Sequence, residues 1–365
     1  MPAGWREFLG ISALLLTQCA VLKGDDRRYV IADQDASGPA GSDMIALLVF
    51  LKSPQVNLLG ITVVTGDAWR DEEVSHALRL LELIGRTDVK VYPGAAYPLV
   101  RTQQETLMWE QLYGKVATWK GAWSTGNHAA ESIPTLPEGA PTKTAEEEDA
   151  PHFMIRMVHK YPHQVTIYGA GPLTNIALAI RLDPHFVETA KELVIMGGGL
   201  NPQTSDQEFA DNPRHEFNYW FDPEAASITL RAPWAKITDT TVDASLQVTP
   251  TEQMFARWSR LNTPAARYLT KYTTRPLSSY MWDELAAAAW LDPEIVTSAR
   301  EVYMDVDTGH GPAYGDTLIW NEIDKPAITV RKVHAQVSVD PARLEKKLTE
   351  LLSNPAPGET HPMME

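Results

Sequence analysis

The chain has 365 residues, of which 47 are Asp or Glu and 32 are Lys or Arg, so its formal net charge is -15. This length can form a sizeable hydrophobic core, in one large α/β domain or in two domains. The negative charge disfavours binding to a nucleic acid polymer or to an anionic membrane, and favours a small polar ligand or a cation. Cys19 is the only cysteine, which excludes an internal disulfide and a cysteine-based zinc site.

The N-terminus contains an apolar run from Phe8 to Leu22, followed by charged residues. The run is short for a membrane span and is typical of a signal-peptide core. Within it, Leu16-Thr-Gln-Cys19 is similar to the cleavage box of bacterial lipoproteins. We therefore expect residues 1–24 to be a signal peptide or an N-terminal extension. Export, to the periplasm or to a lipid anchor on Cys19, is favoured over a cytoplasmic location, and we expect no integral membrane span.

The first element is the apolar segment Tyr29-Val-Ile-Ala-Asp33-Gln-Asp35, which is followed by a Gly/Pro-rich loop and by the apolar run from Met44 to Leu51. This pattern predicts a strand, a loop and a helix. Carboxylates then lie at the carboxyl end of the strand, the edge where open α/β sheets bind ligands.

The acids of this loop have two interpretations. Asp33, Asp35 and Asp43 would repel one another unless a cation or shared protons neutralised them, and a site made only of oxygen ligands favours calcium or magnesium. Alternatively, Ser42 and Asp43 cap the helix while the other two acids are ordinary loop residues.

The rest of the chain alternates between apolar runs of strand length and segments with helical spacing. This alternation predicts an α/β fold with an open, mainly parallel central sheet and helices on both faces. We expect strands at 57–64, 89–94, 165–168, 193–196 and 302–307, and helices at 71–84, 152–160, 173–181 and 341–352, with further helices that begin near Asp222 and Asp283.

Residues 102–150 interrupt this alternation with an irregular, Trp-containing insertion. Such an insertion is typical of a lid or binding loop, or of a surface excursion held by buried tryptophans. We expect one domain over residues 25–353 and a disordered Pro-rich tail over 354–365.

Several motifs, taken in order, resemble the nucleoside hydrolase family of the inosine–uridine-preferring type, across roughly Tyr29 to Lys332. The motifs are Asp33-x-Asp35 with Asp43, Gly60-Ile-Thr-Val-Val-Thr-Gly-Asp67, Val91-Tyr-Pro-Gly-Ala, Gly171-Pro-Leu-Thr-Asn175, Val194-Ile-Met-Gly-Gly198, Glu216-Phe-Asn218 with Asp222-Pro-Glu-Ala-Ala, and Asp283 before its helix.

The resemblance implies calcium-dependent hydrolysis of the N-glycosidic bond of ribonucleosides or related ribosides, with release of ribose and base. It implies a calcium ion held by the carboxylates of Asp35, Asp43 and Asp283 and by the backbone carbonyl of Ala170. It also implies that ribose hydroxyls are bound by Asn212, Glu216 and Asn218, and that the protein forms a homodimer or homotetramer.

Two positions depart from the family pattern. Ser42 stands where the family has an aspartate as general base, in a loop three residues longer than usual. Either Asp33 or Asp67 then acts as the general base, or the longer loop supplies a water path. Alternatively, the protein is a calcium-dependent ribose- or nucleoside-binding protein without turnover. Trp282 stands where a histidine is common; an indole can stack on the leaving base or pack internally, and His310 is another candidate for activating the leaving group.

The signal-peptide interpretation predicts a shortened mature protein. Expression in a bacterial host followed by N-terminal sequencing should find the first residue at Cys19 or soon after it, because the apolar run is removed on export. A mature chain that begins at Met1 would contradict export.

Overall fold

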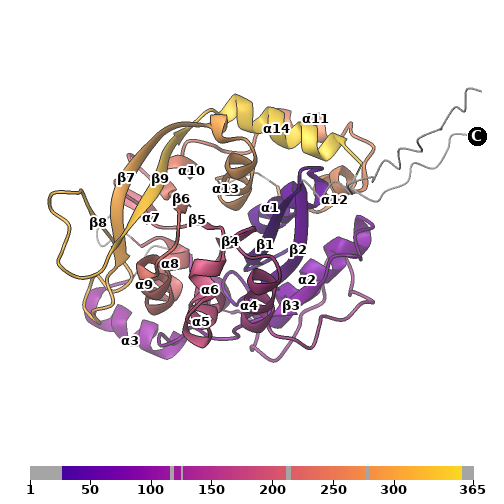
Figure 1. Ribbon diagram of the computed structural model, residues 1–365. Coiled ribbons are helices and arrows are strands. Elements are labelled where there is room, and N and C mark those ends of the chain that lie inside the picture. The colour runs from indigo at the N-terminus through magenta and orange to yellow at the C-terminus, as the bar shows by residue number, and fades with distance from the viewer. Residues whose placement is uncertain (1–26, 116–118, 125, 211–214, 276–279, 356–365) are drawn as a thin grey trace, which may run out of the picture.

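The computed structural model describes residues 27–115, 119–124, 126–210, 215–275 and 280–355 (Figure 1). The predicted signal peptide, residues 356–365 of the predicted tail and Asn212 lie outside these ranges. Within them, no helix is both long enough and apolar enough to cross a membrane.

A nine-stranded sheet organises the chain, in the order β3-β2-β1-β4-β5-β6-β9-β7-β8. Strand β7 runs antiparallel to its neighbours β8 and β9, and the remaining pairs are parallel. The mainly parallel α/β fold predicted from the sequence is therefore confirmed. The strands are β1 Arg28–Gln34, β2 Val56–Val63, β3 Val91–Pro93, β4 Val165–Ala170, β5 Glu192–Met196, β6 Ile237–Thr240, β7 Val296–Val306, β8 Thr317–Trp320 and β9 Arg331–Val339.

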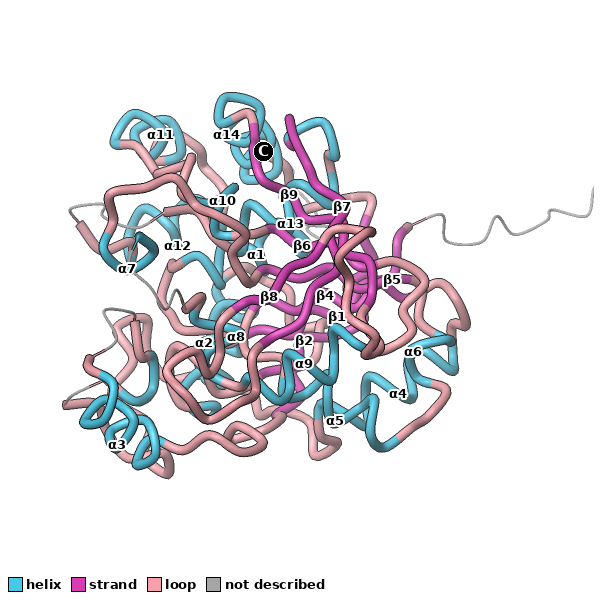
Figure 2. The backbone as a smooth tube through the Cα atoms, turned by 90° about the vertical axis from the view of Figure 1, so that its left-hand side faces the viewer, coloured by secondary structure: helices cyan, strands magenta, loops and turns pink. Residues whose placement is uncertain are grey.

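Helices cover both faces of this sheet. Figure 2 shows α4, α5, α6 and α9 gathered on one side of the strands, whereas α1, α13 and α14 lie on the other. The α-helices are α1 Ser42–Lys52, α2 Arg70–Leu83, α3 Gln103–Tyr113, α4 Ala150–Lys160, α5 Thr174–Leu182, α6 Phe186–Thr189, α7 Gln207–Ala210, α8 Phe217–Phe221, α9 Pro223–Arg231, α10 Val242–Ser245, α11 Glu252–Trp258, α12 Pro264–Tyr272, α13 Asp283–Leu291 and α14 Pro341–Ser353, with short 3-10 helices η1 Gly121–Trp123 and η2 Pro293–Ile295.

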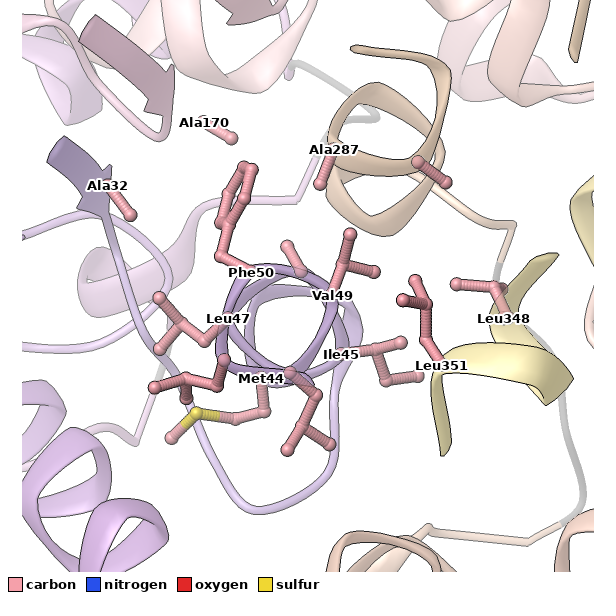
Figure 3. Close-up of a cluster of buried hydrophobic side chains, with 14 of the residues drawn as sticks. Ala32, Met44, Ile45, Leu47, Val49, Phe50, Ala170, Ala287, Leu348 and Leu351 are labelled. Atoms are coloured by element: carbon pink, nitrogen blue, oxygen red, sulfur yellow. The ribbon is translucent and has the colours of Figure 1, made fainter. Parts of the chain in front are cut away.

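Helix α1 is buried on every side, which explains why its sequence is apolar throughout rather than amphipathic. Figure 3 shows its side chains directed towards the sheet, α13 and α14. The ring of Phe50 packs edge-on against Tyr168 of β4, with 4.8 Å between ring centroids. This packing fixes the first turn of α1 at the carboxyl end of β1. The residues labelled in Figure 3 are Met44, Ile45, Leu47, Val49 and Phe50 of α1, Ala32 and Ala170 of the sheet, Ala287 of α13, and Leu348 and Leu351 of α14.

Three expectations from the sequence need correction. The 102–150 insertion is not irregular throughout: α3 opens it, and a capping box between Thr102 and Glu105 begins that helix. Strand β7 begins six residues earlier than expected, at Val296, because it pairs along most of its length with β9, a strand that we did not anticipate. The N-cap of α1 is Gly41, and no side chain caps that helix. Ser42 and Asp43 therefore do not act as caps.

Truncation of Phe50 tests whether the packing of α1 against the sheet stabilises the fold. Because Phe50 is 2% exposed, Phe50→Ala should lower the free energy of unfolding by about 3–5 kcal/mol, measured by urea denaturation. Leu182→Ala at the exposed end of α5 is the matched control, with an expected change of less than about 1 kcal/mol. Equal losses in the two variants would contradict a central role for α1.

Candidate active site

Three carboxylates from distant parts of the chain meet at the carboxyl edge of the sheet. Asp35 follows β1, Asp43 lies in the first turn of α1, and Asp283 lies in the first turn of α13. One oxygen of each lies within 4.8 Å of the others, and all three side chains are buried. The structure thus brings together the three acids that the sequence analysis assigned to one metal ion.

The electrostatics of this cluster favour a cation. Burial raises the pKa of Asp35, Asp43 and Asp283 well above the ordinary value, and their mutual repulsion raises it further. A bound divalent ion would remove this penalty, and carboxylate oxygens are the ligands that hard cations prefer. The three residues therefore fit a metal ion.

Gln34 connects two of these acids. Its side-chain nitrogen donates to Asp43 Oδ1 at 3.2 Å and also to Asp283, although Gln34 and Asp283 are 249 positions apart. Its side-chain oxygen is buried and has no hydrogen-bond partner among the described residues. Gln34 therefore orients Asp43 and Asp283 through hydrogen bonds to their oxygens.

A cavity of about 500 Å³ opens above the three acids. Its walls combine aromatic rings with further carboxylates. The lining residues other than the three acids are Ser37, Gly38, Pro39, Gly41, Ser42, Asp67, Trp119, Met196, Asp206, Glu208, Phe209, Glu216, Phe217, Asn218, Val242, Thr274, Tyr280 and Trp282.

The profile of the inosine-uridine preferring nucleoside hydrolases matches residues 30–346. The chain belongs to this family. It is 28% identical to a probable uridine nucleosidase of Arabidopsis thaliana, over 90% of this chain and 98% of that protein. It is 26% identical to a pyrimidine-specific ribonucleoside hydrolase of Escherichia coli, over 86% and 94% of the two chains.

A solved structure leads to the same assignment. The purine-preferring ribonucleoside hydrolase from Gardnerella vaginalis superposes with a TM-score of 0.70 at 27% identity, over 89% of this chain and 98% of that one. Membership of the nucleoside hydrolase family makes the chain an N-glycosyl hydrolase.

Two glycines allow Asp35 to enter the nucleoside hydrolase site. A Cβ atom on Gly66 would lie 2.1 Å from Asp35 Oδ2, and one on Gly171 would lie 2.7 Å from Asp35 Oδ1. Any other residue would displace the carboxylate at these positions. Ala170, the predicted carbonyl ligand, ends β4 directly before Gly171 and pairs in register with Gln34.

The two predicted candidates for the general base lie in different environments. Asp67 lines the cavity: its Oδ1 accepts a hydrogen bond of 2.5 Å from Trp119 Nε1, and its backbone N–H donates to Asp35 at 3.1 Å. Burial raises the pKa of Asp67 to about 6. Asp33 is not among the lining residues, and its Oδ1 accepts from Thr62 at 2.6 Å and from Asn175 at 2.8 Å.

Two of the predicted ribose-binding residues lie together across the cavity. Glu216 is the N-cap of α8, and its carboxylate accepts from the backbone of Gly198, Asn218 and Tyr219 at 2.8 to 3.0 Å. Burial raises its pKa to about 7 despite these bonds. Asn218 donates to the carbonyl of Met196 at 3.0 Å. The third predicted residue, Asn212, is outside the described ranges.

Trp282 forms part of the aromatic wall. Its ring lies 5.6 Å from Phe209 and 5.4 Å from Tyr280 between centroids, and it is half-buried at the cavity. It therefore packs against neighbours and also faces the cavity. His310 does not line this cavity; it stacks on Tyr314, with 4.4 Å between centroids.

Ser42, which the sequence analysis expects to depart from the family pattern, has three hydrogen-bond partners: Glu284 and the backbone N–H groups of Trp282 and Asp283. Its hydroxyl donates to Glu284 and accepts from the backbone N–H of Asp283 at 3.0 Å. Glu284 is buried, and burial raises its pKa to about 7. The carboxylate of Glu284 is thus present near this part of the site, but the residue that lines the cavity is Ser42.

Several residues of this site were not predicted, namely Gln34, Asp206, Glu208, Phe209, Tyr280 and Glu284. The position of Gln34 between two predicted acids was a usable signal. Glu284 directly follows the predicted Asp283 in α13, which was also a usable signal. The remaining four lie in loops or in the short helix α7 without a motif, so only their spatial convergence identifies them.

The three acids predict a pH-dependent response to metal. Because their pKa is raised in the folded state, the metal-free protein holds protons there that the unfolded chain has lost, and its stability falls as pH rises through those values. Calcium must displace these protons. The increase in Tm on addition of CaCl2 to protein treated with EDTA should therefore grow between pH 5 and pH 8.

Asp283→Asn should abolish most of this increase, whereas Asp324→Asn on the exposed surface should retain it. Differential scanning fluorimetry measures both. An increase that is the same at every pH, or that Asp283→Asn leaves intact, would show that calcium binds elsewhere.

Proposed function

We propose that the protein is a calcium-dependent ribonucleoside hydrolase that cleaves the N-glycosidic bond of ribonucleosides or related ribosides. The observation that carries this proposal is the convergence of Asp35, Asp43 and Asp283, buried, at the floor of a cavity in a member of the nucleoside hydrolase family. Calcium suits the site better than magnesium, because it accepts more oxygen ligands in a less regular arrangement.

The three carboxylates and the backbone carbonyl of Ala170 would hold the ion. When bound, calcium supplies a positive charge that orients the vicinal hydroxyls of ribose and makes a neighbouring water more acidic. In this proposal Glu216, Asn218 and also Asn212 bind the ribose hydroxyls, as the resemblance implies. The ribose would then lie between the cluster and α8, with its anomeric carbon in the cavity.

The carboxylates of the cavity match the charge that the reaction creates. Cleavage of a glycosidic bond builds positive charge on the ribose ring. Asp67 and Glu216 both line the cavity, and their negative charges stabilise such a ring without reorganisation. This preorganised field lowers the barrier to bond cleavage.

Asp67 is the better placed general base. Its carboxylate faces the cavity, whereas both donors to Asp33 hold that residue within the sheet edge. The bond from Trp119 occupies one oxygen of Asp67 and orients the carboxylate, so that the other can accept a proton from water. Asp33 instead positions Asn175 and Thr62.

The main alternative is a calcium-dependent nucleoside-binding protein. The hydroxyl of Ser42 favours it, because a serine is a poor base without activation and stands at the family's catalytic position. Binding without release of ribose would support this alternative.

The proposal predicts release of ribose from a panel of ribonucleosides in the presence of calcium, measured by a reducing-sugar assay. Asp35→Ala and Asp283→Ala should abolish the release. Asp67→Asn should reduce kcat by about 10²-fold or more, the usual contribution of a general base. Asp33→Asn should reduce it by less.

Two outcomes would revise this proposal. A larger loss of kcat in Asp33→Asn than in Asp67→Asn would assign the base to Asp33. A faster Ser42→Asp variant would show that the family's usual position is still usable. Thermal melts of each variant distinguish loss of catalysis from loss of folding.

A further inference from the structure

Besides the three metal-binding acids, the cavity has a lining that is both aromatic and anionic. Trp119 and Trp282 line it, and so do the carboxylates of Asp67, Asp206 and Glu208. The wall comes from separate parts of the chain: the loop after β2, the insertion, the region of α7 and the residue before α13. A base joined to a ribose at the three acids would extend within this same cavity, which these side chains line.

Trp119 donates hydrogen bonds to two of these carboxylates, one from its indole and one from its backbone. Its Nε1 donates to Asp67 at 2.5 Å, and its backbone N–H donates to Glu208 at 2.9 Å. The residue is nevertheless 52% exposed, so the ring retains a surface that a ligand can contact. On the same wall, the hydroxyl of Tyr280 lies 3.3 Å from Asp206 Oδ2, and the Tyr280 ring lies against Trp282.

The charged side chains among the described residues of this lining are all acidic. Among the described residues that line the cavity there is no lysine, arginine or histidine, whereas seven lining residues are Asp or Glu. A calcium ion would compensate two negative charges at the floor, and the field at the outer wall would remain negative. Electron-rich ring faces next to carboxylates attract an organic cation by cation–π and Coulomb interactions.

The chemistry of base release also favours a ligand with a positively charged base. A neutral purine or pyrimidine must gain a proton as it leaves, and no imidazole or ammonium group of the described lining can supply one. A base that already carries a positive charge needs no proton, because it leaves as a neutral molecule.

We propose that this site prefers ribonucleosides whose base carries a fixed positive charge, such as N7-alkylated purine ribosides or pyridinium ribosides. The proposal rests on the hydrolytic function argued above and narrows its substrate class. In the reaction, the water oxygen bonds to C1′ and the electron pair of the C1′–N bond moves onto the base nitrogen, which neutralises the ring. One proton of the water passes to Asp67 and then to solvent.

The first test compares 7-methylguanosine with guanosine, which differ at the base by one methyl group and its charge. We expect a higher kcat/KM for 7-methylguanosine. Part of that preference reflects the weaker bond of the methylated substrate, so the decisive quantity is the change in the ratio between variants. Glu208→Gln and Asp206→Asn keep their shapes and acceptor oxygens, and each should lower the ratio about fivefold or more.

Glu301→Gln is the matched control, since Glu301 lies on β7 and pairs with His334 outside the cavity. It should leave the ratio unchanged. Raising NaCl from 50 to 500 mM should lower the ratio in the unmodified protein, because salt screens the attraction. A second pair of substrates, a pyridinium riboside with a carboxamide and the same riboside with a carboxylate, should favour the carboxamide.

The outcomes separate the two claims. Hydrolysis of guanosine together with a ratio that neither Glu208→Gln nor Asp206→Asn changes would overturn the preference and leave the hydrolase proposal intact. Absence of ribose release from every substrate, with calcium present and the protein folded by its melting curve, would overturn both. A ratio that falls in both variants and with salt supports the preference.

Discussion

Repulsion among three buried carboxylates is the constraint on which this structure depends. Asp35, Asp43 and Asp283 have their oxygens within 4.8 Å of one another in a region with little water, where like charges are costly. The surrounding core must therefore hold them in place. Helix α1 does so for Asp43 and packs directly on α13, which carries Asp283. A bound metal ion would neutralise the repulsion among the three carboxylates, and this relief would contribute to the affinity for the ion.

The insertion after β3 contributes Trp119 to the lining of the cavity. Trp119 donates to Asp67, and the backbone of Asp67 donates to Asp35, so a chain of two hydrogen bonds joins the insertion to the cluster of three acids. The buried Trp123 fixes this segment by stacking on Phe221, with 4.2 Å between centroids. Trp123 thus holds the insertion in place, whereas Trp119 lies at the cavity, and a role of the insertion as a lid or binding loop stays a prediction.

Ser42 and Glu284 form a hydrogen-bonded pair beside the three acids. An aspartate at position 42 would place a carboxylate against Glu284 and directly beside Asp43, which would add to the repulsion. The serine hydroxyl instead donates to Glu284 and accepts from the backbone of Asp283. The hydroxyl therefore stabilises the first turn of α13, and with it a metal-binding acid.

The sequence by itself determined the fold class, most of the elements and the three acids that meet at the sheet edge. Apolar periodicity reports local structure, and the motifs of a family keep their order along the chain. Only the tertiary structure decided that Gln34 bridges Asp43 and Asp283, that Asp67 rather than Asp33 lines the cavity, and that the cavity wall is anionic. These properties arise when side chains far apart in sequence meet, and no local pattern records such a meeting.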